Sequence, residues 1–331
     1  MSRILVTGGA GFIGSHVAEK LLKRGHNITI LDDLSGGFTD NLVEGISFVR
    51  GSITDVGLVN DLFKKKQFEY VFHLAAYAAE GLSHFIKRFN YNNNLIGSVN
   101  LINASVNTGV KCFVFTSSIA VYGTSPELPM TEQTPARPED SYGIAKLAVE
   151  QELRVCKEMF DLNYVIFRPH NVYGERQNIG DKYRNVVGIF MNQILQGKPM
   201  TVFGDGNQTR AFSYIGDIAP IMAEAIDIPA ACNQVFNIGA DQPYSVNDLA
   251  SAVARAMEVA PDIVHFPARN EVMNAYSSHE KIERAFSERK LHDLDEGLSR
   301  MAKWVKQNGA RTSQKFKDIE VTKNFPKAWL V

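Results

Sequence analysis

Cysteine is scarce in this chain. Three of the 331 residues are cysteines, at Cys112, Cys156 and Cys232, and no two of them form a CxxC pair. The sequence therefore offers neither a disulfide framework nor the ligand spacing of a zinc site, and no metal is expected. All three lie in apolar or helical stretches, which indicates reduced, buried thiols.

Long apolar runs and an excess of charge are also missing. No run reaches the ~18 apolar residues that a membrane span needs. The amino terminus, Met-Ser-Arg-Ile-Leu-Val, leads into a strand rather than a signal peptide. The formal net charge is -1, so no basic field is available to hold nucleic acid. We expect a soluble cytoplasmic protein with no membrane or nucleic-acid partner.

The sequence is rich in apolar, β-prone runs that alternate with helical patterns. Seven strands are predicted, at Arg3–Thr7, Asn27–Leu31, Ile46–Arg50, Tyr70–Leu74, Lys111–Thr116, Tyr164–Arg168 and Gln234–Ile238. Helices are predicted between them, including Gly14–Arg24, Asn93–Thr108 and Ile144–Phe160. Continuous apolar strands separated by helices predict an α/β fold with a doubly wound parallel sheet of the Rossmann type.

The alternation weakens after Arg168, where loops rich in Gly, Asn and Gln interrupt short helices. We therefore predict a large sheet domain at residues 1–168, to which residues 212–240 return. Residues 169–211 and 241–331 are predicted to form a smaller lobe at the carboxyl edge of the sheet. A length of 331 residues suits this division.

The first predicted strand ends in a glycine-rich turn with Gly8, Gly11 and Gly14. Such a turn lets the backbone approach a pyrophosphate, and the free N–H groups of the following helix point at it. The second strand ends at Asp32-Asp33, 18 residues past Gly14. A carboxylate there binds the adenine ribose and repels a 2′-phosphate. The pattern predicts NAD rather than NADP as the cofactor.

A second constellation predicts oxidation of an alcohol. Tyr142 and Lys146 form a YxxxK on one face of a predicted helix, and Ser118 follows the fifth strand. A free phenol has a pKa of ~10, so it needs a nearby cation to act as a base near neutral pH. Lys146 and a positive nicotinamide would supply that charge, and Ser118 would share the reacting hydroxyl.

These motifs together resemble those of the extended short-chain dehydrogenase/reductases. Within that group, the chain is similar to the NAD-dependent sugar-nucleotide epimerase/dehydratase family and is UDP-glucose 4-epimerase-like. The resemblance covers nearly the whole chain. It is carried by Gly8–Gly14, Phe72–Ala76, Ser117-Ser118, Val121–Gly123, Tyr142 with Lys146, Arg168–Gly174, Phe203–Gly206 and Arg210.

The resemblance implies two sets of binding residues. Candidate cofactor contacts, besides the three glycines, Tyr142 and Lys146, are Phe12, Ile13, Asp32, Asp33, Ser35, Gly36, Ser52, Ile53, Leu74, Ala75, Ala76, Asn94, Thr116, Ser117, Pro169 and His170. Candidate sugar-nucleotide contacts, besides Ser118 and Tyr142, are Ala79, Glu80, Asn171, Asn185, Val186, Val202, Phe203, Arg210, Arg269 and Glu271. Guanidinium groups suit a diphosphate because they bind its oxygens in pairs.

The chain departs from the family pattern at several positions. Ser52 stands where relatives usually carry an acid near the adenine, and Pro169-His170 replaces a common Tyr-Phe pair. His170 could contact the substrate or be a packed structural histidine. Glu80 could be a sugar ligand, an additional acid or base, or structural.

Ile119-Ala120 follows the catalytic Ser118. Dehydratases of this family place an Asp-Glu pair there and decarboxylases a Glu, whereas neither side chain here can move a proton. This favours a 4-epimerase that acts through a 4-keto sugar, on a UDP-hexose or UDP-uronate. A net NAD(H) dehydrogenase or reductase, a dehydratase and a non-catalytic NAD sensor remain alternatives. UDP is the favoured nucleotide of the substrate, although the sequence does not separate it from GDP or dTDP.

The resemblance also implies a homodimer built from two long helices of each subunit. The candidates are Asn93–Thr108 and Ile144–Phe160.

Overall fold

The computed structural model describes residues 1–269, 271–286, 291–312, 316–326 and 329. Its centre is a seven-stranded parallel sheet in the order β11-β6-β5-β4-β1-β2-β3. The strands are β1 (Arg3–Thr7), β2 (Asn27–Asp32), β3 (Ser47–Arg50), β4 (Tyr70–His73), β5 (Cys112–Thr116), β6 (Asn163–Pro169) and β11 (Gln234–Ile238). Each lies within one residue of its predicted bounds, and the predicted doubly wound Rossmann sheet is confirmed.

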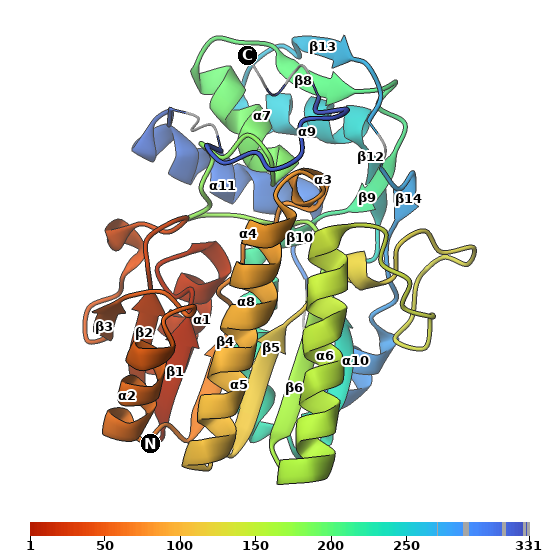
Figure 1. The fold of residues 1–331 in the computed structure, drawn as a ribbon. Helices are drawn as coiled ribbons and strands as arrows, with labels where there is room; N and C mark the ends of the chain where they lie inside the picture. The colour runs from red at the N-terminus through yellow and green to blue at the C-terminus, as the bar shows by residue number, and fades with distance from the viewer. Residues whose placement is uncertain (270, 287–290, 313–315, 327–328, 330–331) are drawn as a thin grey trace.

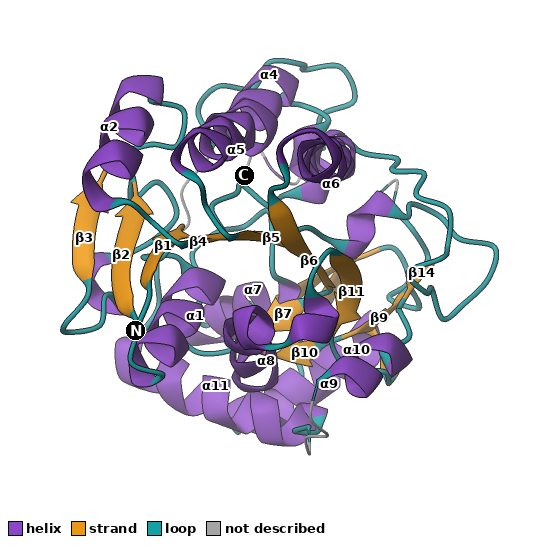
Figure 2. Ribbon diagram, turned by 90° about the horizontal axis from the view of Figure 1, so that it is seen from below, coloured by secondary structure: helices purple, strands orange, loops and turns teal. Residues whose placement is uncertain are grey.

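Alternating side chains along the strands build a core on each face of the sheet. In β1, Ile4 and Val6 enter the core on one face and Leu5 enters the core on the other. One face is covered by α1 (Phe12–Lys23) and α8 (Ile215–Glu224), and the other by α2 (Val56–Lys66), α5 (Gly97–Thr108) and α6 (Ser141–Phe160) (Figures 1 and 2).

The helices differ from the predicted ones mainly at their starts. α6 begins at Ser141, three residues before the predicted Ile144, because the Asp140 side chain caps it by accepting a 2.8 Å hydrogen bond from the Gly143 N–H. α1 begins two residues before the predicted Gly14. The helix predicted from Asn93 is α5 preceded by α4 (Lys87–Tyr91) and a π-helical turn, η2 (Asn92–Ile96).

The helix α2 has no counterpart among the predicted helices. Only Val59, Leu62 and Phe63 of this helix are buried, and its last turn is Lys64, Lys65 and Lys66, so its apolar stripe is narrow. The carboxylate of Asp55 caps it by accepting a hydrogen bond from the Leu58 N–H.

A smaller layer lies beyond the carboxyl ends of the strands (Figure 1). Its helices are α3 (Glu80–Ser83), α7 (Val186–Leu195), α9 (Val246–Met257) and α11 (Leu294–Asn308). Its short strands are β8 (Met200–Phe203) with β13 (Ile263–Phe266), and β12 (Pro243–Ser245) with β9 (Thr209–Ala211) and β14 (Asn274–Ala275). Two further short strands, β7 (Val172–Tyr173) and β10 (Ser213–Tyr214), and a further helix, α10 (Glu280–Ala285), complete the α-helices and strands of the described residues.

The carboxyl-terminal segment, residues 316–326 and 329, contributes several residues to the lining of the cleft between the two layers. Trp329 is buried with Ala79, Leu82 and Tyr183 in a separate apolar cluster, and the Lys182 ammonium donates a 2.9 Å hydrogen bond to the Trp329 carbonyl. The segment therefore closes over α3.

The cysteine prediction is correct at two positions and wrong at the third. Cys112 and Cys156 are buried free thiols, whereas Cys232 is exposed. Cys232 follows a 3-10 turn at the start of β11, where the chain is at the surface, so the apolar neighbours in its sequence do not bury it. Within the described ranges, no helix is long and apolar enough to cross a membrane.

Candidate active site

A cleft of about 2550 Å³ lies at the carboxyl ends of the parallel strands. Ligands of open α/β sheets bind at this edge, and the space exceeds the 300–1,000 Å³ of an ordinary small-molecule pocket. Of the predicted site residues, all but Asn94 and Ala79 line it. The cleft is therefore large enough for a dinucleotide together with a second nucleotide.

The glycine turn forms a backbone cradle at the floor of the cleft. Gly8 has a φ of +71°, and a Cβ added there would lie 2.7 Å from the Ala75 nitrogen. A Cβ on Gly14 would lie 2.1 Å from the Gly8 carbonyl oxygen. Gly11 caps α1 without any side-chain hydrogen bond, so the first N–H groups of that helix are left for a ligand. The arrangement fits a pyrophosphate.

The carboxylate of Asp32 lies at the end of β2 and lines the same cleft. It accepts hydrogen bonds from the Ala10 and Leu34 N–H groups, at 3.0 and 2.8 Å. Burial raises its pKa, and these backbone hydrogen bonds oppose the rise. Because a carboxylate has about four lone-pair positions, Asp32 retains acceptors for ribose hydroxyls.

Two side-chain oxygens on the lining are buried without a hydrogen-bond partner among the described residues. They are Thr116 Oγ1, at the end of β5, and Gln177 Oε1. Unpaired buried polar atoms are costly, so their position in the wall indicates ligand atoms that would complete them. Together with the glycine cradle they fit a bound dinucleotide.

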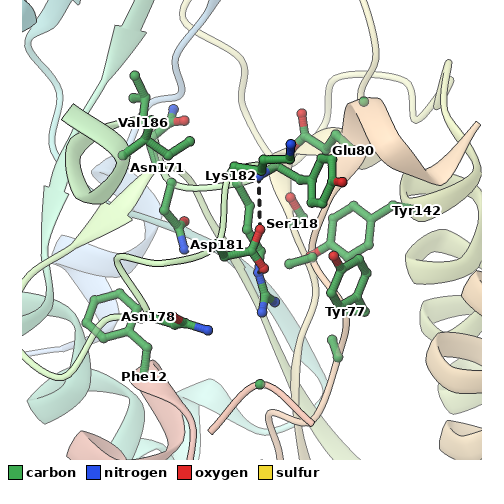
Figure 3. A pocket seen from close by; sticks show the side chains of 18 of the residues that line it. Phe12, Tyr77, Glu80, Ser118, Tyr142, Asn171, Asn178, Asp181, Lys182 and Val186 are labelled. Atoms are coloured by element: carbon green, nitrogen blue, oxygen red, sulfur yellow. Dashed lines mark hydrogen bonds and ion pairs between the residues drawn. The ribbon is translucent and has the colours of Figure 1, made fainter. Parts of the chain in front are cut away.

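The YxxxK pair lies on the face of α6 that is turned toward the cleft. Tyr142 is 5% exposed, and Figure 3 shows its side chain near that of Ser118, with Tyr77 and Glu80, on one side of the cavity. Burial raises the pKa of Tyr142, Glu80 raises it further, and the nearby Ser118 hydroxyl opposes both. The phenol is therefore neutral until positive charge enters the cleft.

Lys146 lies one turn further along α6. Its ammonium donates a 2.8 Å hydrogen bond to the Thr116 carbonyl and lies 5.7 Å from the centre of the Tyr142 ring. Burial lowers its pKa to about 7, and Glu150 opposes the shift. The chain thus holds a poorly solvated cation beside the phenol, where it favours the phenolate.

A buried network lies behind Ser118, Tyr142 and Lys146. Arg168 and Glu150 form a two-pronged ion pair at 2.9 and 2.5 Å. Glu150 also accepts a 2.6 Å hydrogen bond from Ser117, and Arg168 donates one of 2.8 Å to the Tyr122 hydroxyl. This network ties α6 to the ends of β5 and β6, so it fixes Ser118 relative to Tyr142.

The opposite side of the cleft carries the predicted arginines. Arg210 donates hydrogen bonds to the carbonyls of Thr209, Val272 and Met273, and burial lowers its pKa. The Arg269 guanidinium lies 4.1 Å from the centre of the Phe203 ring. Both arginines form ion pairs with Glu271, at 3.7 and 3.4 Å.

Other predicted substrate contacts come from the loops before α7 and after β6. Asn171 donates a 3.2 Å hydrogen bond to the Ala211 carbonyl. Asn185 has a φ of +65° and caps α7 with no side-chain hydrogen bond, so its amide can reach a ligand. Val186, Val202 and Phe203 line the same end of the cleft.

Three predicted contacts are engaged elsewhere. Asn94 does not line the cleft, because its amide is bonded to both backbone groups of Tyr77, at 2.8 and 3.0 Å. Ala79 is 1% exposed and packs in the apolar cluster under the carboxyl-terminal segment. The Ser52 hydroxyl lies on the lining but pairs with the Thr54 side chain at 2.9 Å. At position 52 the chain therefore has no carboxylate that could contact the adenine.

His170 lies in the wall rather than across the cleft. Its Nδ1 is 3.0 Å from the Ala211 carbonyl oxygen and its Nε2 is 3.1 Å from Nε2 of His279. His279 in turn contacts Asp241 at 2.6 Å. Burial lowers the pKa of His170 to about 3. Because protein atoms engage both ring nitrogens, the geometry favours the structural alternative for this residue.

Sequence reasoning missed several lining residues that come from distant loops. Gln177 contributes its unpaired oxygen, Arg184 lies 4.7 Å from the centre of the Tyr77 ring, and Trp329 lies 6.0 Å from the Arg269 guanidinium. None of the three belongs to a periodic pattern or a short motif. Of the three, only Trp329, an isolated tryptophan near the end of the chain, stands out in the sequence as a candidate site residue.

The parallel sheet, glycine cradle and buried Tyr–Lys–Ser group define a Rossmann-type enzyme that transfers hydride to and from a dinucleotide. The family model for the NAD dependent epimerase/dehydratase family matches residues 4–239. The chain belongs to this family, and NAD, the predicted cofactor, is the family's cofactor.

Named relatives agree with this assignment. A UDP-glucose 4-epimerase of Mycolicibacterium smegmatis is 37% identical over 270 residues, which cover 80% of this chain and 85% of the relative. The crystal structure of a Thermotoga maritima UDP-glucose 4-epimerase with UDP-glucose has a TM-score of 0.88 and 33% identity, covering 92% of this chain and 99% of that one. A Bacillus cereus UDP-glucuronic acid 4-epimerase, in complex with UDP-glucuronic acid and NAD, has a TM-score of 0.84 and 28% identity, covering 92% and 99%.

Proposed function

We propose that this protein is a UDP-sugar 4-epimerase that retains NAD through the reaction. The observation that carries the proposal is that the buried side chains of Tyr142 and Ser118 lie together in the cleft, beside a pair of residues, Ile119 and Ala120, that cannot move a proton. Such a site can remove and return the proton of a hydroxyl group. It lacks the adjacent acid that elimination or decarboxylation would need.

The cofactor end of the cleft is assigned to the glycine cradle, Asp32 and the end of β5. Gly8, Gly11 and the amino terminus of α1 would hold the pyrophosphate, and Asp32 the adenine ribose. Thr116 Oγ1 and Lys146 would contact the nicotinamide half of the cofactor. Bound there, NAD supplies a reversible hydride acceptor, so that the hydroxyl at C4 can become a ketone and be restored with the opposite configuration.

The chain's own residues carry out the proton transfer. Tyr142 accepts the 4-hydroxyl proton at its phenolic oxygen, Ser118 orients that hydroxyl, and Lys146 stabilises the phenolate through its charge. The proton returns from the same phenol after the sugar has turned over. No net proton is taken from solvent, which is consistent with the burial of Tyr142 at 5% exposure.

The nucleotide end is assigned to the smaller lobe, at residues 169–211 and 241–331. Arg210 and Arg269 would bind the diphosphate, and Phe203 lies beside Arg269 as a flat surface for the base. The 1–168 and 212–240 segments would hold NAD. The relatives that act on UDP-glucose or UDP-glucuronic acid support UDP as the nucleotide.

A homodimer is the proposed assembly. The outer face of α6 exposes Val155, Met159 and Phe160, at 50%, 68% and 59%, and Ile96 of η2 is 48% exposed. Exposed apolar side chains along the outer face of a long helix are typical of an interface. A second copy of the same helices is the proposed partner, giving a four-helix contact. The cytoplasmic location predicted from the sequence stays a prediction.

The experiment that tests the activity is a panel of sugar nucleotides. UDP-, dTDP- and GDP-linked hexoses and UDP-glucuronate are incubated with the enzyme, and the products are read by NMR. We expect inversion at C4 of a UDP-sugar with no loss of water or carbon dioxide. A 4-keto-6-deoxy product, or release of carbon dioxide, would overturn the proposal.

A further inference from the structure

Glu80 is the first residue of α3 and projects into the cleft beside Tyr142 (Figure 3). Glu80 is exposed, and it lines the cleft. Among the residues that the structure describes, none donates a hydrogen bond to its carboxylate. A carboxylate that has no donor from the protein and is aimed into a binding cleft is a ready acceptor for ligand hydroxyl groups.

The surrounding charges locate Glu80 along the cleft. Its negative charge raises the pKa of Tyr142, the proposed base at C4. Arg210 and Arg269, the proposed diphosphate ligands, act on the Glu80 carboxyl in turn and lower its pKa. Glu80 is thus within electrostatic reach of both ends of the site. The hexose, which joins C4 to the diphosphate, must occupy the space between them.

Other charged groups also face Glu80. Asp140 at the start of α6 and Glu271 before β14 both raise its pKa, and His84 acts on Asp140 from the end of α3. The largest cause is partial desolvation of the carboxylate by the surrounding walls of the cleft, and together these effects raise the pKa of Glu80 to about 7. The two arginines do not neutralise this corner of the cleft.

We propose that Glu80 determines the class of sugar: it accepts hydrogen bonds from a neutral hexose or N-acetylhexosamine and repels the carboxylate of a uronate. The inference rests on the proposed 4-epimerase function. A 4-epimerase presents both faces of the ring to its cofactor, so each edge of the sugar passes the wall that carries Glu80. A uronate would therefore bring its carboxylate against Glu80 in one of the two orientations. Like charges in a partly desolvated site discriminate strongly.

The discrimination depends on pH in a defined direction. Above about pH 7 the carboxyl of Glu80 is ionised and repels a uronate. Below that pH it is neutral, and its hydroxyl can donate to the uronate instead. Preference for the hexose should therefore rise with pH and fall as the medium becomes acidic.

The test compares the wild type with Glu80→Gln, which keeps the size of the side chain and removes its charge. Glu139→Gln is the matched control, because Glu139 also lines the cleft but pairs with Thr124 at the rim. The measured quantity is kcat/KM for UDP-glucose divided by kcat/KM for UDP-glucuronate, at pH 6 and pH 8.5. Binding of both sugar nucleotides to each variant is measured by calorimetry, so that a variant with little turnover is still informative.

For the wild type we expect a ratio well above unity that increases between pH 6 and pH 8.5. In Glu80→Gln the ratio at pH 8.5 should fall by on the order of tenfold or more and lose its pH dependence. Activity toward UDP-glucose should fall by up to about tenfold, because one hydrogen bond weakens. Glu139→Gln should retain the wild-type ratio.

Three results would overturn the inference. The first is a Glu80→Gln ratio equal to that of the wild type in both turnover and binding. The second is an equal loss of turnover on both sugars with unchanged binding, which would make Glu80 an acid or base. The third is a wild type that prefers the uronate. A wild type that inverts C4 of no sugar nucleotide would instead overturn the proposed function, and this inference with it.

Discussion

Glu150 and Arg168 form a two-pronged ion pair in the interior of the protein, with side chains that are 0% and 3% exposed. Glu150 lies four residues after Lys146 on α6, and Arg168 lies in β6. Glu150 also accepts a hydrogen bond from Ser117, the neighbour of the proposed catalytic residue Ser118. Its charges stabilise the site only as long as both are present, because either one alone would be an uncompensated buried charge.

Replacing one partner should therefore be strongly destabilising. We expect Glu150→Gln to lower the free energy of unfolding by roughly 3–5 kcal/mol, as measured by urea denaturation. The matched control is Glu280→Gln, which breaks a surface pair with Arg284 whose side chains are 72% and 77% exposed. That change should cost less than about 1 kcal/mol. Equal effects of the two substitutions would show that the buried pair is not held as described.

Tyr142→Phe removes the proposed base while keeping the ring in its buried position. Turnover should fall by about 10²–10⁴-fold, and the amount of NAD released from the denatured protein should match that of the wild type. Tyr77→Phe, which deletes another phenol from the same wall, serves as the control and should stay close to wild-type turnover. A Tyr142→Phe enzyme of near-normal activity would remove Tyr142 from the mechanism.

Lys146 is held at a cost to stability. Burial lowers its pKa from 10.5 to about 7, so the unfolded chain binds the extra proton between about pH 7 and pH 10.5. Stability contributed by this position therefore rises with pH across that window and is lowest below it. In NAD-free protein, we expect Lys146→Met to be more stable than the wild type at pH 6.5, by roughly 1–3 kcal/mol. The advantage should shrink at pH 9.5, while catalysis is lost at both pH values. A constant difference between the two proteins across this range would contradict the lowered pKa.

The proposed dimer predicts a response to charge on the outer face of α6. Met159→Asp combined with Val155→Asp should convert the protein to a monomer in light scattering, because two carboxylates would be buried against a second copy. Val259→Asp is the control, since Val259 is 43% exposed and lies on the smaller layer. If the wild type is already a monomer, or the double variant remains a dimer, this face is not the interface.

The part of the fold that could be predicted from the sequence is the part encoded by local patterns. The seven strands have continuous apolar runs, and the cradle at Gly8–Gly14 and the pair of Tyr142 and Lys146 have fixed spacings. Each of these features is set by residues close together in the chain. Their placement at one edge then follows from the parallel topology of the sheet.

The remainder depends on contacts between distant segments. Trp329 reaches Tyr183, with ring centroids 5.3 Å apart, and His279 reaches His170 across 109 positions of sequence. Asn94 resembles a cofactor ligand in its motif, yet the structure bonds it to the backbone of Tyr77. No periodicity or spacing in the sequence predicts such contacts, because they depend on how the smaller layer packs on the sheet.

In the proposed function, one NAD molecule stays bound to the enzyme and is used again in every turnover. The most direct measurement is the interconversion of UDP-glucose and UDP-galactose, followed by NMR, with protein purified and assayed without added NAD. We expect conversion in both directions over many turnovers per enzyme molecule, with no accumulation of NADH. Conversion that stops at about one equivalent until NAD is added, with NADH formed in step with product, would contradict it.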